Sequence, residues 1–450
     1  MKRDNDRSLA KLIIGLAWPT MAEQALGTVV QYVDTAMVGR LGQHATACIG
    51  LTASTTWMVN SPLWAFAVGV LACTARAVGA GEEHAIKRTA VQSVIITLAL
   101  GLLIGAVTLI ISPFLPAWLN AEEALRHDGS LYFAIVCAPM LFRAAMVIFS
   151  ASLRATGDTR TPMFINVGMN VCNIILNAIF IYAAGLGVIG AAIATCISYA
   201  LGGTAMTVVF WRNKRVSPRG EKLRYDREAM APIVKISLPV VGTRVATSLG
   251  HVVFTSLVTS LGTQALASHT LAITAEEAFY IPGYGMQAAA STLAGQSLGE
   301  KNREKLWRVS RTIMLATMGM MCLTGGLLFL LPGQMMSLFT TDAAVIAGGI
   351  PILRIVAVTE PIYGMSIILE GTFNGVGDTR APFYISLGCM WGVRVLFTWI
   401  CVTKLGLGLV AVWLCMVADN CSRGALLAVR YFRKIWLDRL LPPEENKQTA

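Results

Sequence analysis

The tetrapeptide Gly157-Asp158-Thr159-Arg160, in the stretch SLRATGDTRTPMF, recurs later in the chain as Gly377-Asp378-Thr379-Arg380 in GTFNGVGDTRAPFY. The separation of these two copies, called here the repeat offset, also relates further landmarks: Pro19 and Pro239, Pro62 and Pro282, Pro162 and Pro382, Leu41-Gly42 and Leu261-Gly262, and Gly79 and Gly299. Because so many landmarks share one offset, the sequence predicts two copies of one structural unit.

The composition is that of a membrane protein. Of the 450 residues, 55% are hydrophobic and only 14% are charged, and the mean hydropathy is +0.63. Soluble domains carry about 25% charged residues, and a membrane-spanning helix needs roughly 20 mostly apolar residues. We therefore predict an all-α polytopic membrane protein with twelve transmembrane helices in two pseudo-symmetric six-helix bundles. The expected spans are 12–39, 47–73, 91–112, 130–152, 162–185, 187–211, 231–257, 266–293, 309–331, 349–372, 382–403 and 406–430.

The distribution of Lys and Arg predicts the orientation, because cytoplasmic loops are enriched in these residues. Starting from a cytoplasmic N-terminus with a retained first helix, the odd-numbered loops hold only Arg40, Arg126 and Lys404. The even-numbered loops and the tail hold most of the other basic residues, seven of them between Arg212 and Arg227. We expect both termini in the cytoplasm of a protein of the cell inner (plasma) membrane. The net charge of +11 then reflects topology, and we expect no nucleic-acid partner.

The predicted domains follow from the repeat. Six spans per half bring each half back to its starting side, so the repeats are parallel and related by an axis along the membrane normal. We expect an N-terminal lobe at 1–211, a basic cytoplasmic linker at 212–230, a C-terminal lobe at 231–430 and a cytoplasmic tail at 431–450.

Polar groups inside the spans point to a cation site in the first half. Asp34 is expected roughly 9 Å below the outer surface, and a carboxylate within a membrane usually marks a functional pathway. Asn177 and Thr195 are predicted at a similar depth. A carboxylate, an amide and a hydroxyl supply the oxygen ligands of a hard monovalent cation, whereas a proton needs only the carboxylate.

The asparagines of this half could bind the cation or serve only to join helices, and the second half lacks the acid. Asn166, Asn170, Asn173 and Asn177 lie on one helical stripe, which is also typical of residues that only bond neighbouring helices. The position that corresponds to Asp34 in the second half is Phe254, so the two halves are chemically unequal.

Other buried polar residues are candidates for contact with cargo. Glu276 and Glu360 are expected near mid-membrane, where they could bind cationic cargo or pair with Arg244 or Arg394 in a structural role. Asp419 and Arg423 are four residues apart and are expected to pair locally. The full set of cavity candidates is Glu23, Gln24, Gln31, Asn170, Glu276 and Glu360.

Enzyme and cofactor motifs are missing from the sequence. It contains no G-x-x-x-x-G-K-[ST] nucleotide loop and no H-E-x-x-H motif. The ten cysteines lie singly in apolar stretches, as small hydrophobic residues do. We expect a secondary transporter, no catalytic residues, no cofactor, and no metal beyond a Na⁺ ion at Asp34.

Several stretches together resemble one family. The opening AEQALGTVVQYVDTAMVGRLG, the doubled GDTR-x-P, the segment IPGYGMQAAASTLAGQSLG and the run NVCNIILN are similar to multidrug and toxic compound extrusion (MATE) transporters. The resemblance implies a V-shaped pair of lobes and cation-coupled efflux by alternating access. It implies a cation site at Asp34, Asn173, Asn177 and Thr195. Many relatives hold an aspartate at position 177, and some hold a glutamate at position 247, which is Thr247 here; Glu276 is the candidate to replace it.

Three functional hypotheses follow from the sequence. The favoured one is a monomeric H⁺- or Na⁺-coupled antiporter that exports amphipathic, mostly cationic organic compounds. The alternative is a flippase for lipid-linked precursors of the same superfamily, which twelve spans and the lack of a dense arginine lining disfavour. The third, a membrane enzyme, lacks catalytic clusters. Beyond cargo, the expected partner is membrane lipid.

Overall fold

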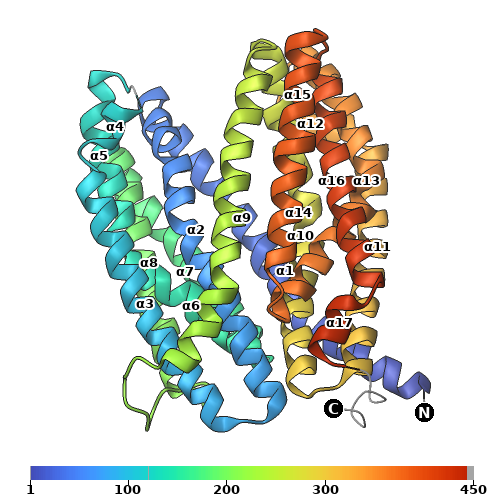
Figure 1. The fold of residues 1–450 in the computed structure, drawn as a ribbon. Helices are drawn as coiled ribbons and strands as arrows, with labels where there is room; N and C mark the ends of the chain where they lie inside the picture. The colour runs from blue at the N-terminus through green and yellow to red at the C-terminus, as the bar shows by residue number, and fades with distance from the viewer. Residues whose placement is uncertain (1, 120, 443–450) are drawn as a thin grey trace. The chain divides into compact units, whose positions relative to one another are not determined.

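The computed structural model describes the backbone of residues 2–119 and 121–442, and the side chains of residues 9–42, 44–119 and 121–442. Regular structure in these residues is helical throughout, as predicted (Figure 1). The first repeat contains α1 (Lys2–Gly39), α2 (Gln43–Ala80), α3 (Glu83–Ile111), α4 (Leu115–Trp118), α5 (Glu123–Cys137), α6 (Met140–Ala155), α7 (Arg160–Asn177), the π-helical η1 (Ala178–Ala183) and α8 (Gly187–Arg212).

The second repeat follows the same order. It contains α9 (Arg227–Thr259), α10 (Thr263–Gly299), α11 (Arg303–Leu330), α12 (Pro332–Ser337), α13 (Ala343–Gly375), α14 (Arg380–Gly388), the π-helical η2 (Cys389–Val395), α15 (Leu396–Trp399), the π-helical η3 (Ile400–Lys404), α16 (Leu409–Phe432) and α17 (Ile435–Leu440). The ends of α1 and α9, and likewise the starts of α7 and α14, are separated by the repeat offset, so the predicted duplication is confirmed.

The repeated GDTR sequence forms the same turn twice. Gly157 and Gly377 have φ of 93° and 81°, values that favour glycine. The N–H of the next residue returns to a carbonyl of the preceding helix in both copies, from Asp158 to Leu153 and from Asp378 to Phe373. This closes the helix end with the hydrogen bonding of a left-handed C-cap, and a new helix begins three residues after each glycine.

The number of spans agrees with the prediction of twelve. In residues 2–119 and 121–442, nine helices are long and apolar enough to cross a membrane, and a tenth is α5 with α6, which meet at a 43° bend. Pro139 lies at that bend and has no N–H to continue the helix. The two remaining long helices, α1 with 38 residues and α10 with 37, are more polar, but their counterparts α9 and α2 both qualify.

The chain packs into two compact units. Residues 22–119 and 121–241 form one, called here the N-terminal unit, and residues 2–21 with 242–442 form the other, the C-terminal unit. The chain therefore passes from one unit to the other inside α1 and again inside α9. The predicted lobes, linker and tail had other limits, and those limits remain predictions.

In the N-terminal unit, α2, α3, α6 and α8 surround one apolar core. Phe149 of α6 stacks on Phe210 of α8 with ring centroids 4.3 Å apart. Small residues allow the close approach of helices, as membrane helix pairs require. A Cβ added to Gly101 of α3 would lie 2.8 Å from the Cα of Leu141 in α6.

The loop between α8 and α9 is held against this unit. Arg88 of α3 pairs with Asp226 and with Glu228. Gln92 of α3 donates from Nε2 to the carbonyl of Arg224 at 3.0 Å, and its Oε1 accepts from the N–H of Asp226. The predicted linker is thus attached to α3 at its C-terminal end.

In the C-terminal unit, α10, α11, α13 and α16 pack together. Tyr431 of α16 lies in their core, where it stacks on Trp307 and shares a hydrogen bond of 2.7 Å with Ser310. The start of α1 joins this core through Ile13 and Leu16, and α17 joins it through Trp436.

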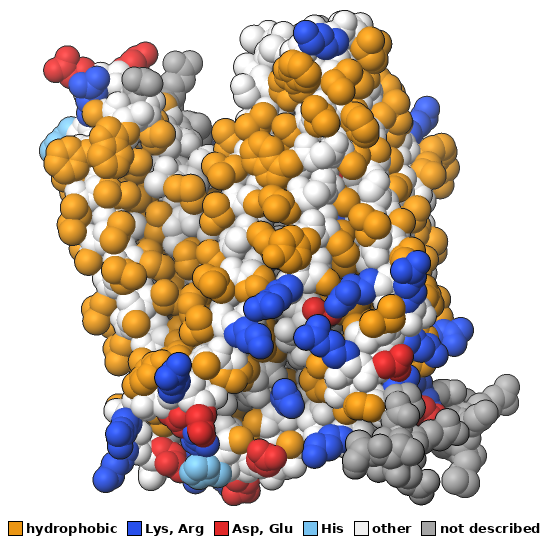
Figure 2. Space-filling model, in the orientation of Figure 1, with side chains coloured by type: hydrophobic (Ala, Val, Ile, Leu, Met, Phe, Trp, Pro, Cys, Tyr) orange, Lys and Arg blue, Asp and Glu red, His pale blue; other side chains and the backbone are white. Residues whose placement is uncertain are grey.

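Charged and apolar side chains are segregated along the helices. Figure 2 shows apolar side chains over the middle of the visible face of each unit, with most of the Lys, Arg, Asp and Glu side chains in the lower part of the view and a few at the upper end. Inside the C-terminal unit, Asp419 is fully buried and pairs with Arg394 at 2.8 Å and with Arg423 at 3.2 Å. The predicted pair of Asp419 and Arg423 is confirmed, and Arg394 joins it.

Candidate functional site: a polar cluster and a pocket in the N-terminal unit

Asp34 is a half-buried side chain on α1, five residues before the end of the helix. Asn177, at the end of α7, donates from Nδ2 to Asp34 Oδ1 at 2.8 Å. Sequence spacing alone suggested a shared depth for these two residues, and the structure brings them into direct contact.

Asn173 and Thr195 complete the group. Asn177 Nδ2 also lies 3.2 Å from Asn173 Oδ1, and Asn173 Nδ2 lies 3.4 Å from Thr195 Oγ1 of α8. With the amide of Asn173 turned over, its nitrogen lies 3.1 Å from Asp34 Oδ2 and 3.3 Å from Asp34 Oδ1. In either orientation all four side chains lie within one hydrogen-bonded group, called here the Asp34 cluster.

The backbone changes character at this cluster. Directly after Asn177, α7 becomes the π-helical η1, Ala178–Ala183. Single π-helical turns within α-helices occur frequently at functional sites. Asn177 Oδ1 is buried, and within the described structure it accepts no hydrogen bond. A buried amide oxygen without a donor is costly, and an oxygen in this position suits a cation.

The second repeat does not keep the Asp34 cluster. At the repeat offset, Asp34, Asn173, Asn177 and Thr195 correspond to Phe254, Val393, Phe397 and Cys415. Phe254 is buried and packs edge-on against His269. Since the same helices form without these polar groups, the repeat does not need the cluster in order to fold.

The other predicted residues of this unit lie apart from the cluster. Glu23 forms a two-pronged ion pair with Arg154 of α6, with distances of 2.9 Å and 2.8 Å from Nη2 to its two carboxylate oxygens. Gln31 lines the same pocket as Glu23. Gln24 is exposed and Asn170 is half-buried, and neither lines that pocket.

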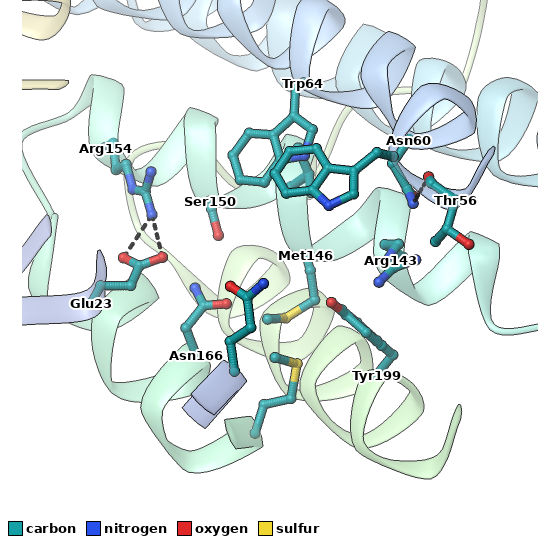
Figure 3. A pocket seen from close by; sticks show the side chains of 14 residues that line it. Glu23, Thr56, Asn60, Trp64, Arg143, Met146, Ser150, Arg154, Asn166 and Tyr199 are labelled. Carbon is teal, nitrogen blue, oxygen red and sulfur yellow. Dashed lines mark hydrogen bonds and ion pairs between the residues drawn. The ribbon is translucent and has the colours of Figure 1, made fainter. Parts of the chain in front are cut away.

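This pocket has a volume of about 340 Å³ and lies wholly within the N-terminal unit. It is called here the Arg143 pocket, after a residue that the sequence analysis did not select. Its lining comes from α1, α2, α6, α7 and α8: Glu23, Gln31, Thr56, Trp57, Asn60, Trp64, Arg143, Met146, Val147, Ser150, Arg154, Asn166, Met169 and Tyr199. Figure 3 shows the Glu23–Arg154 pair on one side, Arg143 on the other, and Trp64 between them.

Sequence reasoning missed Arg143 although a signal was present. It is a basic residue inside a predicted span, and such residues are rare and costly in membranes. The sequence analysis named acids and amides inside the spans of the first half, and named arginines only in the second half.

In the C-terminal unit, Glu276 and Glu360 are 2% and 1% exposed, as their predicted depth implies. Arg394 pairs with Asp419, and the described residues show no ion pair from Arg394 to either glutamate. Glu276 Oε1 and both carboxylate oxygens of Glu360 are buried and, in the part of the chain that the structure describes, make no hydrogen bond. The described residues thus show no ion pair of Glu276 or Glu360 with Arg244 or Arg394, and the two roles considered for these glutamates remain predictions.

The kinds of side chain that lie together limit the kind of ion that could bind. Residues 9–42, 44–119 and 121–442 contain no group of three His, Cys, Asp or Glu side chains arranged to hold a metal ion. A small monovalent cation instead takes carboxylate, amide and hydroxyl oxygens, which the Asp34 cluster offers together.

Both repeats of the chain match one known protein family. The family model named MatE matches residues 19–179 and again residues 239–400. This chain belongs to the MatE family. The starts of the two matches are separated by the repeat offset, in agreement with the duplication.

Curated relatives are similar over almost the whole chain. The probable multidrug resistance protein NorM of Thermotoga maritima is 26% identical, covering 97% of this chain and 95% of its own. The multidrug resistance protein PmpM of Pseudomonas aeruginosa is 25% identical, covering 86% of this chain and 83% of its own.

Solved structures share the fold. A crystal structure of MATE in complex with MaL6 has a TM-score of 0.91 at 24% identity, covering 96% of this chain and 97% of that one. An outward-facing multidrug resistance MATE family transporter of the MOP superfamily has a TM-score of 0.88 at 24% identity, covering 98% and 97%. As a MatE-family protein, the chain is a multi-pass secondary transporter of small molecules that needs no cofactor, and it is not an enzyme.

Proposed function

We propose that this protein is an antiporter that exports amphipathic, mostly cationic organic compounds in exchange for H⁺ or Na⁺. We place it, as a monomer, in the cell inner membrane with both termini in the cytoplasm. The observation that carries the proposal is the Asp34 cluster: a half-buried carboxylate joined to two amides and a hydroxyl, and present in one repeat only.

The cluster offers a direct way to link cation binding to helix position. Without a cation, the Asn177 amide nitrogen donates to Asp34 and joins α7 to α1. A Na⁺ ion would take Asp34 Oδ1, and rotation of the Asn177 amide would turn its unpartnered Oδ1 toward the ion. A proton on Asp34 would instead weaken the charge-assisted hydrogen bond from Asn177. Either event changes the contact between α1 and the η1 end of α7.

A coupling ion must bind one conformation better than another in order to drive transport. The chain crosses between the two units inside α1, which carries Asp34. A change in how α1 packs on α7 would therefore act on a helix that both units share. This supports Asp34 as the coupling group, with Asn173, Asn177 and Thr195 as its supporting ligands.

Efflux from whole cells tests the proposal. Cells that overexpress the protein and are loaded with a fluorescent cationic dye should export it, and an ionophore that abolishes both the Na⁺ and the H⁺ gradients should stop export. Selective collapse of one gradient identifies the coupling ion. Export that continues with both gradients collapsed would contradict cation coupling.

A further inference from the structure

The loop between α8 and α9 carries an excess of positive charge. From Arg212 to Arg227 the chain holds seven basic residues and two acids, and one of the acids, Asp226, already pairs with Arg88 of α3. The seven basic side chains are all exposed, and none of them forms an ion pair with a described residue. They are Arg212, Lys214, Arg215, Arg219, Lys222, Arg224 and Arg227. Their charge is therefore available to a partner outside the chain.

Basic residues near another loop that is expected in the cytoplasm do have acidic partners. Around the connection of α10 and α11, Lys305 pairs with Glu300 at 2.6 Å and Arg308 pairs with Glu304 at 2.6 Å. The topology of a membrane protein favours basic residues on the cytoplasmic side, but it does not require that they lack acidic partners. Topology alone thus does not account for the unpaired charge of the α8–α9 loop.

The backbone of this loop is held in place at both ends. Asn213 Oδ1 accepts hydrogen bonds from the N–H groups of Arg215 at 2.8 Å and Val216 at 3.2 Å, and Val216 is fully buried in the apolar core of the N-terminal unit. At the other end, Gln92 of α3 bonds the backbone of Arg224 and Asp226. A surface that is ordered before binding loses less entropy when it binds a partner.

The second end of the loop lies at the level of the membrane surface. Gln92, which bonds the backbone of Arg224 and Asp226, is the second residue of the span predicted for α3. Likewise, α9 begins at Arg227, four residues before its predicted span, which is roughly 6 Å along a helix. The headgroup layer on each side of a bilayer is about 5–7 Å thick. Residues 222–227 therefore lie at the depth of the lipid headgroups.

Apolar side chains are exposed at the same place. Leu223 is 58% exposed and Tyr225 is 60% exposed, and they alternate with the basic Lys222 and Arg224. Tyrosine is enriched where membrane meets water, and basic residues combined with apolar ones bind surfaces of anionic lipid. A soluble polyanion would neutralise the charge but would leave Leu223 and Tyr225 in water, so the lipid surface is the better partner.

We propose that residues 212–227 dock on anionic phospholipid headgroups, with the basic side chains on the phosphates and with Leu223 and Tyr225 at the edge of the apolar layer. In the proposed orientation these lipids belong to the inner leaflet. The loop leads directly into α9, one of the two helices that pass between the units, so the contact would hold the start of α9 at the membrane surface. The docking requires neither the proposed cargo nor the coupling ion.

Hydrogen exchange of the full chain in lipid nanodiscs tests the docking, because both faces of a nanodisc are open to solvent. Exchange of the amides within 214–225, measured by mass spectrometry, is compared in phosphatidylglycerol, which is anionic, and in phosphatidylcholine, which is neutral overall. It should be about tenfold slower in phosphatidylglycerol, and about 0.5 M NaCl should remove most of the difference because salt screens exposed charges. Amides at 300–302 should exchange equally in the two lipids.

A matched pair of variants tests the role of the unpaired charge. Lys222→Gln combined with Arg224→Gln should remove most of the tenfold difference, since each basic residue near an anionic surface contributes about fivefold to affinity. Lys305→Gln combined with Arg308→Gln removes as much positive charge from side chains that already have acidic partners, and should leave the difference unchanged. Equal loss in both double variants would show that only the net charge of the protein matters, and would overturn the assignment to this loop.

The apolar contribution has its own variant. Leu223→Ser combined with Tyr225→Ser keeps the charge and should reduce the difference between the lipids severalfold. Wild-type exchange within 214–225 that is equal in the two lipids would overturn the proposal. Slower exchange in phosphatidylcholine nanodiscs on addition of polyglutamate or inorganic phosphate would also overturn it, because the surface would then bind a soluble anion. None of these measurements involves transport, so the docking and the proposed export stand or fail separately.

Discussion

At the scale of single residues, the polar groups of the N-terminal unit fall into two sets. The Asp34 cluster combines one acid with neutral oxygens, and it is suited to a small cation. The Arg143 pocket combines the Glu23–Arg154 ion pair and the guanidinium of Arg143 with the indole rings of Trp57 and Trp64.

Asn177 gives the sharpest test of the first set. Asn177→Asp places a second carboxylate where an amide now lies 2.8 Å from Asp34. Two adjacent negative charges attract a cation more strongly than one, so the Na⁺ or H⁺ concentration that gives half-maximal efflux should fall about tenfold. Asn170→Asp adds the same charge on the same stripe of α7 but outside the cluster. This variant should lower the cation concentration for half-maximal efflux much less. Identical shifts in both variants would remove Asn177 from the cation site.

At the scale of helices and loops, close packing in the N-terminal unit depends on individual glycines. Gly101 and Gly105 lie one turn apart on α3 and make a G-x-x-x-G pattern. A Cβ at Gly101 would lie 2.8 Å from the Leu141 backbone, whereas a Cβ at Gly105 would lie 3.4 Å from the Met140 side chain. Only the Cβ added at Gly101 would clash with main-chain atoms.

Gly101→Ala should therefore separate α3 from α6 and cost about 1–3 kcal/mol of stability, as overpacking generally does. Gly105→Ala should cost much less. Thermal unfolding of the two purified variants, followed by the loss of the monodisperse peak, measures the difference. Equal unfolding temperatures would mean that α3 and α6 are farther apart than the structure has them.

The attachment of the α8–α9 loop gives a pH-dependent prediction. Desolvation alone would raise the pKa of Asp226, but hydrogen bonds from the Arg88 side chain and from the N–H groups of Ala229 and Glu228 hold that pKa below its ordinary value of 3.8. A lowered pKa means that the charged carboxylate is favoured in the folded state. The stabilisation that the charged Asp226 carboxylate gives to the folded state is fully present when the pH is above that ordinary pKa, and it is lost only at lower pH.

We therefore expect trypsin to cleave wild type more slowly than Asp226→Asn within residues 214–224. The ratio of these two cleavage rates should be the same at pH 8 and at pH 6. Asp226→Asn should be cut faster than wild type at both pH values, because the ion pair with Arg88 is lost. Glu228→Gln is the matched control: its side chain also contacts Arg88, but it is 84% exposed, and exposed ion pairs contribute little. Equal cleavage rates for wild type and Asp226→Asn would contradict the attachment of the α8–α9 loop to α3.

At the scale of the whole molecule, much of the fold was predictable because the decisive signals are repeated. Two copies of GDTR, a shared offset and long apolar stretches predicted the helical class, the duplication and the number of spans. The end of α2 and the start of α3 were not predicted, because both lie outside the apolar stretches. α2 continues beyond its apolar part to Ala80, and α3 begins at Glu83, before its apolar part.

The candidate site was predictable in part. Depth along a helix placed Asp34, Asn177 and Thr195 at one level, since helical rise is constant. The same reasoning could not show that Glu23 pairs with Arg154 of a distant helix, nor that Arg143 lines a pocket with Tyr199. Those contacts depend on the rotation of packed helices about their axes, which hydropathy does not specify.

The proposed orientation predicts which loops can be labelled from outside intact cells. Arg126→Cys and Lys404→Cys should react with a membrane-impermeant maleimide, and Arg219→Cys should not, because basic residues favour the cytoplasmic side. Wild type gives the background from the ten native cysteines. A permeant maleimide should label all three variants, which confirms that each site is reactive. Labelling of Arg219→Cys by the impermeant reagent would reverse the assignment.

The coupling role of Asp34 is the central claim, and transport by Asp34→Asn in proteoliposomes tests it most directly. Purified wild type, Asp34→Asn and Glu277→Gln, which removes an exposed acid from α10, are reconstituted at equal density. Transport of dansylcadaverine, a fluorescent organic cation, is then driven by an imposed Na⁺ or H⁺ gradient. We predict that Asp34→Asn inserts and unfolds like wild type but loses gradient-driven transport, and that Glu277→Gln retains it. Gradient-driven transport by Asp34→Asn at the wild-type rate would contradict the account.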